Sequence, residues 1–236
     1  MDPGGGRVAP EPITVLRERP LPEPARAAAD AALIDAFGLE VPLPRRLCAT
    51  GRRHKVYEAR GWRILTPGHA PGDGLAAHLT FALKHEGVDL AVLRALFAAS
   101  GGSTVETWVR ETPTGSYARR AWFLYEWLMG GTLDLDPAAS GAYVGALDPD
   151  VQWAVDGSRS PRHRVVDNLP GTRSFCPLAY RTELLERYVR ADLASRARRA
   201  TDALPPDLVA RAAAFLLLSD SRSSFAIEGE SPPQDR

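Results

Sequence analysis

The sequence predicts a mainly α fold: a helical bundle around a central aromatic helix, with a small β-hairpin. Apolar residues recur at three- and four-residue spacing over most of the chain, and residues 117–129 are apolar or aromatic at nearly every position after Arg120. A surface helix would keep one polar face, so we expect this aromatic helix at the centre. Residues 54–66 alternate around an Arg-Gly pair, which predicts the hairpin.

The remaining helices follow from apolar spacing and capping residues. Leu75, Leu79 and Leu83 lie four residues apart, which places them on one helix face. Asp89 is suited to cap the next helix, and Ser103-x-x-Glu106 has the spacing of a capping box. We expect helices over residues 22–38, 72–85, 89–99, 103–111, 117–129, 182–204 and 205–229.

The chain divides into three expected parts. Residues 1–22 are rich in Pro and Gly and predict a flexible tail. Residues 23–178 form the expected N-terminal domain, and residues 179–236 form a helical segment. Within the domain, residues 132–178 carry many turn residues and predict an ordered connector around the helical body. The alternative is a small sheet shared with the hairpin, since short apolar runs are ambiguous.

The composition is that of an ordinary globular protein. The 236 residues are 44% hydrophobic and 25% charged, enough for one large domain or two smaller ones. Basic and acidic side chains number 29 each, so the balance does not favour nucleic acid or an anionic membrane as a partner.

Cysteine usage and apolar runs bear on the cellular compartment. Cys48 and Cys176 are far apart and have no ligand-spaced neighbours, so we expect free thiols in a reducing compartment and no metal site. The N-terminus lacks the pattern of a signal peptide. The longest strongly apolar run, residues 212–218, is too short to cross a bilayer. The sequence therefore predicts a cytoplasmic protein with no membrane partner.

The last predicted helix changes character along its length. Its first half is apolar, residues 219–224 are largely polar, and Phe225 and Ile227 are apolar again. Gly229 then ends the helix. We interpret this segment as a helix with a buried trunk and a tip directed at a further surface.

The tip sequence SFAIEG, residues 224–229, matches [Ser/Thr]-x-x-x-Glu-[Gly/Asn], the pattern of the inhibitory helix in Fic-family proteins. The chain also resembles the N-terminal region of a bacterial Fic subgroup in three phrases: GWRILTPGHAPGDGLAAHLTFALKHEG, ARRAWFLYEWLMG and SPRHRVVDNLPGTRSFCPL. The resemblance covers residues 50–236. The resemblance implies an enzyme that uses Mg²⁺ to transfer AMP from ATP to a hydroxyl side chain of a target protein. It also implies that the tip inhibits this enzyme.

The resemblance implies a role for each residue of the tip. Glu228 would form a charge-assisted pair with the last arginine of the family's catalytic loop, the cation that otherwise binds the γ-phosphate of ATP. Ser224 lies one helical turn earlier and would hydrogen-bond nearby. Gly229 would let the backbone turn away, and Phe225 and Ile227 would anchor the tip.

The catalytic loop of the family, His-x-Phe-x-[Asp/Glu]-Gly-Asn-Gly-Arg, does not occur in these residues. Of the five histidines, only His69 begins a similar stretch, HAPGDG, which lacks the Phe, the Asn and the Arg. We therefore predict no catalytic residue, no cofactor held by this chain and no activity for it alone. We expect the catalytic core downstream of Arg236, separated by a truncation, a frameshift or a fragment boundary. The expected partner is that catalytic core, in cis or in trans. The sequence does not identify the protein that is modified, and it leaves open whether the chain forms a homodimer.

Other functions and other roles are weighed beside this one. Segments 89–99 and 103–111, joined by SGGS, could form a helix-turn-helix, so the alternative is a DNA-binding or antitoxin-type regulator. The equal numbers of basic and acidic side chains argue against nucleic acid as a binding partner. A third hypothesis is a scaffold or interaction module that uses the hairpin and the aromatic helix. It is compatible with the Fic hypothesis, because N-terminal domains of that family could select partners or dimerise. His163 is interpreted as a loop histidine, and Arg119 and Arg120 as solvated or structural.

Overall fold

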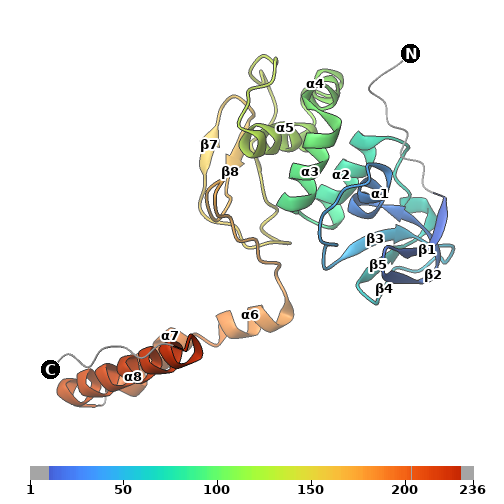
Figure 1. Cartoon of the computed structure of the whole chain (residues 1–236). Helices are drawn as coiled ribbons and strands as arrows, with labels where there is room; N and C mark the ends of the chain where they lie inside the picture. The colour runs from blue at the N-terminus through green and yellow to red at the C-terminus, as the bar shows by residue number, and fades with distance from the viewer. Residues whose placement is uncertain (1–10, 203, 230–236) are drawn as a thin grey trace. The chain divides into compact units, whose positions relative to one another are not determined.

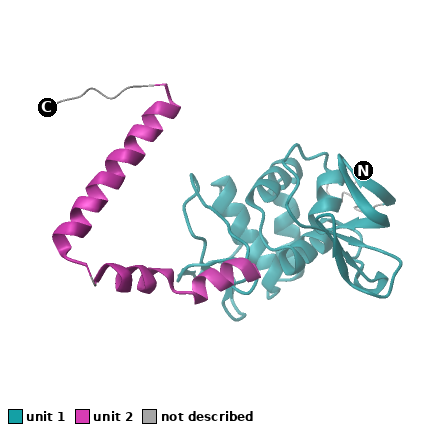
Figure 2. Cartoon of the chain, turned by 90° about the horizontal axis from the view of Figure 1, so that it is seen from below, with its two compact units in different colours: residues 1–181 teal, residues 182–236 magenta. Residues whose placement is uncertain are grey.

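The computed structural model describes residues 11–202 and 204–229. Contacts divide the chain into two compact units, residues 1–181 and residues 182–236 (Figure 2), which we describe one at a time. The first ten residues of the expected N-terminal tail lie outside the described residues.

The first unit contains a five-stranded mixed sheet in the order β1-β2-β3-β5-β4 (Figure 1). Its strands are β1 (Pro12–Leu16), β2 (Arg19–Ala28), β3 (Leu47–Thr50), β4 (Tyr57–Ala59) and β5 (Trp62–Leu65). Neighbouring strands are antiparallel except β3 and β5, which pair in parallel. Every residue of β3 is buried, as expected for a strand covered on both faces.

The predicted hairpin is confirmed as β4 and β5. The turn residues Arg60 and Gly61 have φ angles of 54° and 79°. Two positive φ angles in succession are what a two-residue type I′ turn requires, and this turn matches the twist of the strands. What the sequence did not indicate is that β5 also pairs with β3, which makes the hairpin the edge of a larger sheet.

The helix expected over residues 22–38 is mostly wrong. Its first residues belong to β2, and the helix α1 spans only Ala29–Ala36. Residues 12–22, expected as tail, likewise form β1 and the start of β2. Alanines favour a helix locally, but β2 pairs with β1 on one side and β3 on the other. Tertiary pairing therefore overrides local propensity here.

Four helices lie between the five-stranded sheet and a second, smaller sheet (Figure 1). They are α2 (Leu75–His85), α3 (Leu90–Ser100), α4 (Gly102–Glu111) and α5 (Ser116–Met129). The short 3₁₀ helix η1 (Pro67–His69) precedes α2. Trp122 of α5 is 1% exposed, and the helix contacts α2, α3 and α4, so the central position predicted for the aromatic helix is confirmed.

One of the two predicted caps is correct. The Asp89 side chain accepts the backbone N–H groups of Ala91 and Val92, which caps α3. Ser103 lies inside α4 rather than before it, because the helix begins at Gly102. Glu106 accordingly does not close a capping box; its carboxylate accepts the backbone N–H of Asp134 at 3.1 Å.

The segment expected as a connector contains a second sheet. Strands β6 (Val144–Gly145), β7 (Ser158–Ser160) and β8 (Val165–Asp167) pair in the order β6-β8-β7. The alternative of a small sheet was nearer to the structure, but these strands do not join the hairpin. They pack against α5 instead.

These sheets overturn the predicted fold class. The protein is an α/β fold with two mixed sheets, not a mainly α helical bundle with a single hairpin. The strands outside the hairpin were not predicted because most of them are short, or carry prolines and alanines, and show little alternation. Short apolar runs of this kind do not distinguish a strand from a helix by periodicity alone.

The second unit consists of α6 (Glu183–Arg190), α7 (Leu193–Asp202) and α8 (Pro206–Ile227). One helix was expected over 182–204, but the chain breaks at Asp192, whose φ angle is 44°. The Thr182 side chain accepts the backbone N–H of Leu185 and caps α6. None of the described residues of these three helices is buried.

Candidate functional site

The residues of the predicted inhibitory tip lie on the last turns of α8. Ser224 and Phe225 are within the helix, Ile227 is its last residue and Glu228 caps it. The backbone N–H of Glu228 donates to the carbonyl of Ser224 at 3.1 Å, so the helical geometry extends to the carboxylate. Gly229 has a φ angle of 73°, a left-handed conformation that favours glycine and ends the helix.

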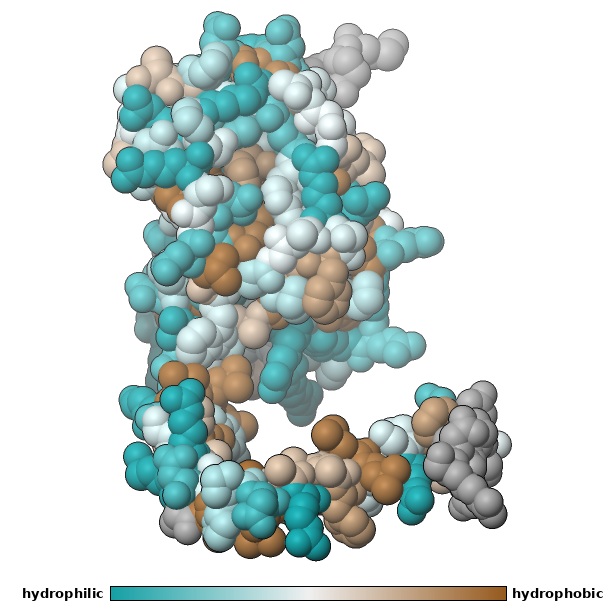
Figure 3. Space-filling model, turned by 90° about the vertical axis from the view of Figure 1, so that its left-hand side faces the viewer, coloured by the Kyte–Doolittle hydropathy of each residue, from teal (hydrophilic) through white to brown (hydrophobic). Residues whose placement is uncertain are grey.

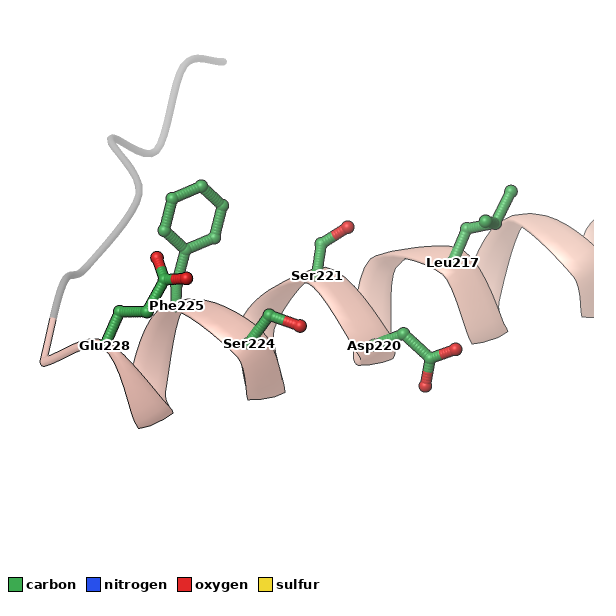
Figure 4. A pocket seen from close by; sticks show the side chains of 6 residues that line it. All are labelled: Leu217, Asp220, Ser221, Ser224, Phe225 and Glu228. Atoms are coloured by element: carbon green, nitrogen blue, oxygen red, sulfur yellow. The ribbon is translucent and has the colours of Figure 1, made fainter. Parts of the chain in front are cut away.

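A shallow hollow runs along this side of α8 (Figure 4). It is lined by Leu217, Asp220, Ser221, Ser224, Phe225 and Glu228. These residues recur at spacings of three and four, so they form two adjacent rows on one helix face. The structure therefore brings together three of the predicted site residues: Ser224, Phe225 and Glu228.

Ile227 does not belong to this face. It does not line the hollow, and it is 87% exposed. Ile227 and Phe225 would therefore meet a partner from different sides of the helix. The anchoring roles predicted for the two residues stay predictions.

Asp220 is a residue that sequence reasoning missed. It stands eight residues before Glu228 and four before Ser224, so the three form one row along the helix. Eight residues correspond to a rise of about 12 Å. The lining of the hollow carries two carboxylates and no cationic side chain. The four-residue spacing of Asp220, Ser224 and Glu228 was visible in the sequence and could have revealed the row.

The middle of α8 is apolar on every side. The four consecutive side chains of Phe215, Leu216, Leu217 and Leu218 are all more than half exposed. Successive residues on a helix are rotated by about 100°, so four in a row point in all directions. Apolar side chains are visible along the helices of the second unit (Figure 3). A helix that is apolar all round is typical of a helix enclosed on several sides.

Helix α6 presents a narrower apolar face. Leu184, Leu185, Tyr188 and Val189 are exposed on it, while its charged residues occupy the remaining positions. Contiguous exposed apolar side chains are a feature of protein interaction sites.

A second polar cluster surrounds Glu126 of α5 in the first unit. Its carboxylate accepts hydrogen bonds from the indole of Trp122 at 2.8 Å and the backbone N–H of Leu133 at 2.9 Å. It also pairs with Arg162 at 3.1 Å and with His163 Nε2 at 3.0 Å. One carboxylate therefore ties α5 to two separate loops.

The charges in this cluster follow from its surroundings. Burial alone would raise the pKa of Glu126, but the hydrogen bonds from Arg162, Leu133 and Trp122 lower it below its ordinary value. Burial lowers the pKa of His163, although the charge of Glu126 opposes this effect. Glu126 is thus ionised and His163 neutral near pH 7.

Ser160 extends the cluster, because its hydroxyl lies 2.8 Å from His163 Nδ1. A serine, a histidine and a carboxylate linked by successive hydrogen bonds have the connectivity of a catalytic triad. Here the carboxylate is already held by Arg162, Trp122 and a backbone amide, and the imidazole packs edge-on against Trp122. We therefore assign Glu126 and His163 to a structural clamp. Sequence reasoning placed His163 in a loop but gave no sign of the clamp.

The paired arginines of α5 are structural. Arg119 and Arg120 are 2% and 4% exposed. Arg120 donates through Nε and Nη2 to the carbonyl of Ala146, and Arg119 donates to the carbonyls of Ala142 and Arg164. Both side chains thereby hold the loops of the second sheet against α5.

His69 lies in η1, and its Nδ1 is 2.7 Å from the hydroxyl of Thr66.

Across residues 11–202 and 204–229, no group of three or more His, Cys, Asp or Glu side chains is arranged to hold a metal ion. Over the same residues, no helix combines the length and the apolar character needed to span a membrane.

No protein-family model, no curated protein and no solved structure shows a significant match to the chain.

Proposed function

We propose that this chain is the regulatory, non-catalytic portion of a cytoplasmic Fic-type protein AMP-transferase. Its α8 tip would restrain a catalytic core formed by polypeptide outside these residues. The observation that supports the proposal most is the placement of Ser224 and Glu228 on one exposed face, directly before the left-handed Gly229. This is the arrangement that the [Ser/Thr]-x-x-x-Glu-Gly pattern requires.

The restraint in this proposal is electrostatic. Glu228 would neutralise an arginine of the catalytic loop through a charge-assisted hydrogen bond, and that arginine would then be withheld from the γ-phosphate of ATP. The lining of the hollow does not suit a triphosphate, because its two carboxylates would repel the phosphate charges. ATP and Mg²⁺ are therefore proposed for the core and not for α8 itself.

The rest of α8 fits a helix that a partner encloses. The apolar residues 215–218 point in all directions and would be covered on several sides. Asp220 would add a second acidic contact on the row of Glu228. We therefore propose a partner surface with an apolar slot for the trunk of α8 and cationic groups over the row of Asp220, Ser224 and Glu228.

The direct test is self-modification in a polypeptide that joins this chain to the catalytic loop. Replacing Glu228 with glycine removes a charge-assisted contact of about 1.5–3 kcal/mol, so we expect at least ~10-fold more AMP incorporated from labelled ATP. Asp220→Asn should give a smaller increase. Arg222→Gln serves as the matched control, since Arg222 does not line the hollow. Unchanged incorporation in Glu228→Gly would remove Glu228 from the inhibitory role.

A second test uses the chain alone. Incubated with ATP, Mg²⁺ and candidate proteins, it should transfer no AMP, because the catalytic loop is not among its residues. Robust labelling would contradict the proposal.

The alternative of a DNA-binding or antitoxin-type regulator rests on α3 and α4. The face of α4 formed by Val105, Trp108 and Val109 is buried against the core. Its outer positions include Glu106, Arg110 and Glu111, a set without the basic excess that binding to phosphates needs. A salt-dependent shift of DNA in a gel would favour this alternative.

A further inference from the structure

Two buried carboxyl groups meet where β2 turns into α1. Asp30 is 3% exposed and Glu86, which directly follows α2, is 2% exposed. Glu86 Oε2 accepts the backbone N–H of Asp30 at 3.0 Å, and Oε1 accepts the backbone N–H of Cys48 on β3. A single carboxylate thereby joins α1, β3 and the end of α2, a region that we call the acidic seam.

The backbone at the acidic seam needs this support. Ala29 has a φ angle of 54°, a left-handed conformation that is unfavourable for a residue with a Cβ. The next N–H, that of Asp30, is the one that Glu86 accepts. The hydrogen bond therefore stabilises a junction that the local backbone would not favour by itself.

The groups around the acidic seam are mostly acidic. Burial raises the pKa of Asp30 well above its ordinary value, and the charges of Glu86 and Asp89 and a hydrogen bond to Glu86 raise it further. Burial raises the pKa of Glu86 to about 7, against opposing hydrogen bonds from Asp30 and Cys48. Two carboxyls in one dry site cannot both be charged without a large cost.

The neighbouring side chains from the other elements do not neutralise the pair. Burial, followed by the nearby negative charges, raises the pKa values of the Cys48 thiol and the Tyr180 hydroxyl. Both groups therefore stay neutral. The cations nearby are Arg63 and Arg46, which act on Cys48 and Tyr180 respectively.

We propose that Asp30 and Glu86 share a proton and form a pH-dependent latch of the first unit. While the pair holds at least one proton, the two carboxyls carry at most one negative charge, and the acidic seam is closed. When the proton is lost to solvent, two negative charges face each other in a buried site, and α1 separates from β3 and α2. This inference does not depend on the function proposed above.

The sign of the effect follows from the direction of the shifts. Both carboxyls have higher pKa values in the folded protein than when unfolded, so their contribution to stability is complete at acidic pH. It is lost as the pH rises through the folded values. For Glu86, a shift from 4.5 to about 7 corresponds to a change on the order of a hundredfold in the folding equilibrium constant.

The buried thiol of Cys48 reports on opening of the acidic seam. The other cysteine is Cys176, so the full chain carrying Cys176→Ser reacts only at Cys48. The alkylation rate with iodoacetamide is measured from pH 6 to pH 9 and divided by the rate of the urea-unfolded chain at the same pH. This ratio removes the ordinary increase in thiolate and reports the fraction of open molecules.

We expect this ratio to rise at least tenfold across the range. Asp30→Asn replaces the shared proton with an amide donor that does not titrate, so its ratio should rise less than that of the parent, with only the titration of Glu86 remaining. Glu86→Gln loses one of the two backbone acceptors, so its ratio should be high at every pH. Asp35→Asn, at an exposed position of the same helix, is the matched control and should follow the parent. A constant ratio in the parent, or an equal rise in Asp30→Asn, would overturn the proposal.

Discussion

The two units of this protein bury their apolar side chains to opposite extents. The first unit packs Trp62, Trp122 and Phe97 into a core where each is at most 1% exposed. The second unit leaves Phe215 71% and Leu217 68% exposed. Both sets are ordinary core residues by type, so residue type alone does not decide which apolar side chains become buried. Hydrophobic burial stabilises the first unit, and the exposed side chains of the second unit contribute little to its own stability.

The largest expected difference comes from the same substitution made in each unit. Leu124 of α5 is fully buried, so Leu124→Ala should lower the free energy of unfolding of the first unit by about 2–5 kcal/mol. Leu217→Ala in α8 should change it by less than about 0.5 kcal/mol, because that side chain is exposed. Urea unfolding followed by tryptophan fluorescence measures both. Equal losses would show that α8 packs on the first unit.

The clamp at Glu126 should be the next most sensitive feature. Arg162→Met removes a half-buried partner of Glu126 and should cost about 1–3 kcal/mol at pH 7. The pKa of Glu126 is lowered in the folded protein, so this contribution is present at neutral pH and is lost as the pH falls through the folded value. The free energy of unfolding should therefore change more between pH 7 and about pH 3 in the parent than in the variant.

An exposed pair provides the comparison for that experiment. Arg110 pairs with Glu106 at 3.3 Å, and its side chain is 52% exposed. Arg110→Met should cost only about 0–1 kcal/mol, because water and salt screen an exposed pair. A loss as large as that of Arg162→Met would argue that the two pairs are equivalent.

Helix caps give a smaller contrast between the units. Asp89→Ala removes the two bonds that cap α3 and should destabilise the first unit by about 1 kcal/mol. Thr182→Ala removes the cap of α6 and should leave the unfolding of the first unit unchanged while reducing helicity measured by circular dichroism. A shift in the unfolding midpoint with Thr182→Ala would mean that the units unfold together.

The smallest expected effect is that of removing the second unit. A chain that ends at Arg181 keeps every buried residue of the core. Its free energy of unfolding should match that of the full chain within about 0.5 kcal/mol. A larger loss would show that the helices of the second unit stabilise the first.

The sequence predicted some elements correctly because their causes are local. Asp89 caps α3 with its own side chain, and the Arg60–Gly61 turn closes the hairpin through its own φ angles. Helix α5 could be found from its composition. The tip of α8 could also be located in advance, since Ser224 and Glu228 share a face in any α-helix.

Other features could not be predicted because their causes lie far away in the chain. The alanines of β2 favour a helix until β1 and β3 pair with them. Glu86 receives N–H groups from residues 56 and 38 positions earlier in the sequence. Glu126 likewise meets Arg162 only after the second sheet has folded against α5. No local pattern marks such contacts.

Backbone geometry over a few residues fixes three features that the sequence predicts: the Asp89 cap of α3, the hairpin turn and the order of side chains along the α8 tip. Contacts between distant segments decide that Pro12–Leu16 and Arg19–Ala28 form strands, that the fold is α/β, and that two carboxyls share a buried site. Strand pairing and burial depend on partners distant in sequence, and their free energies exceed the local preferences of the residues involved.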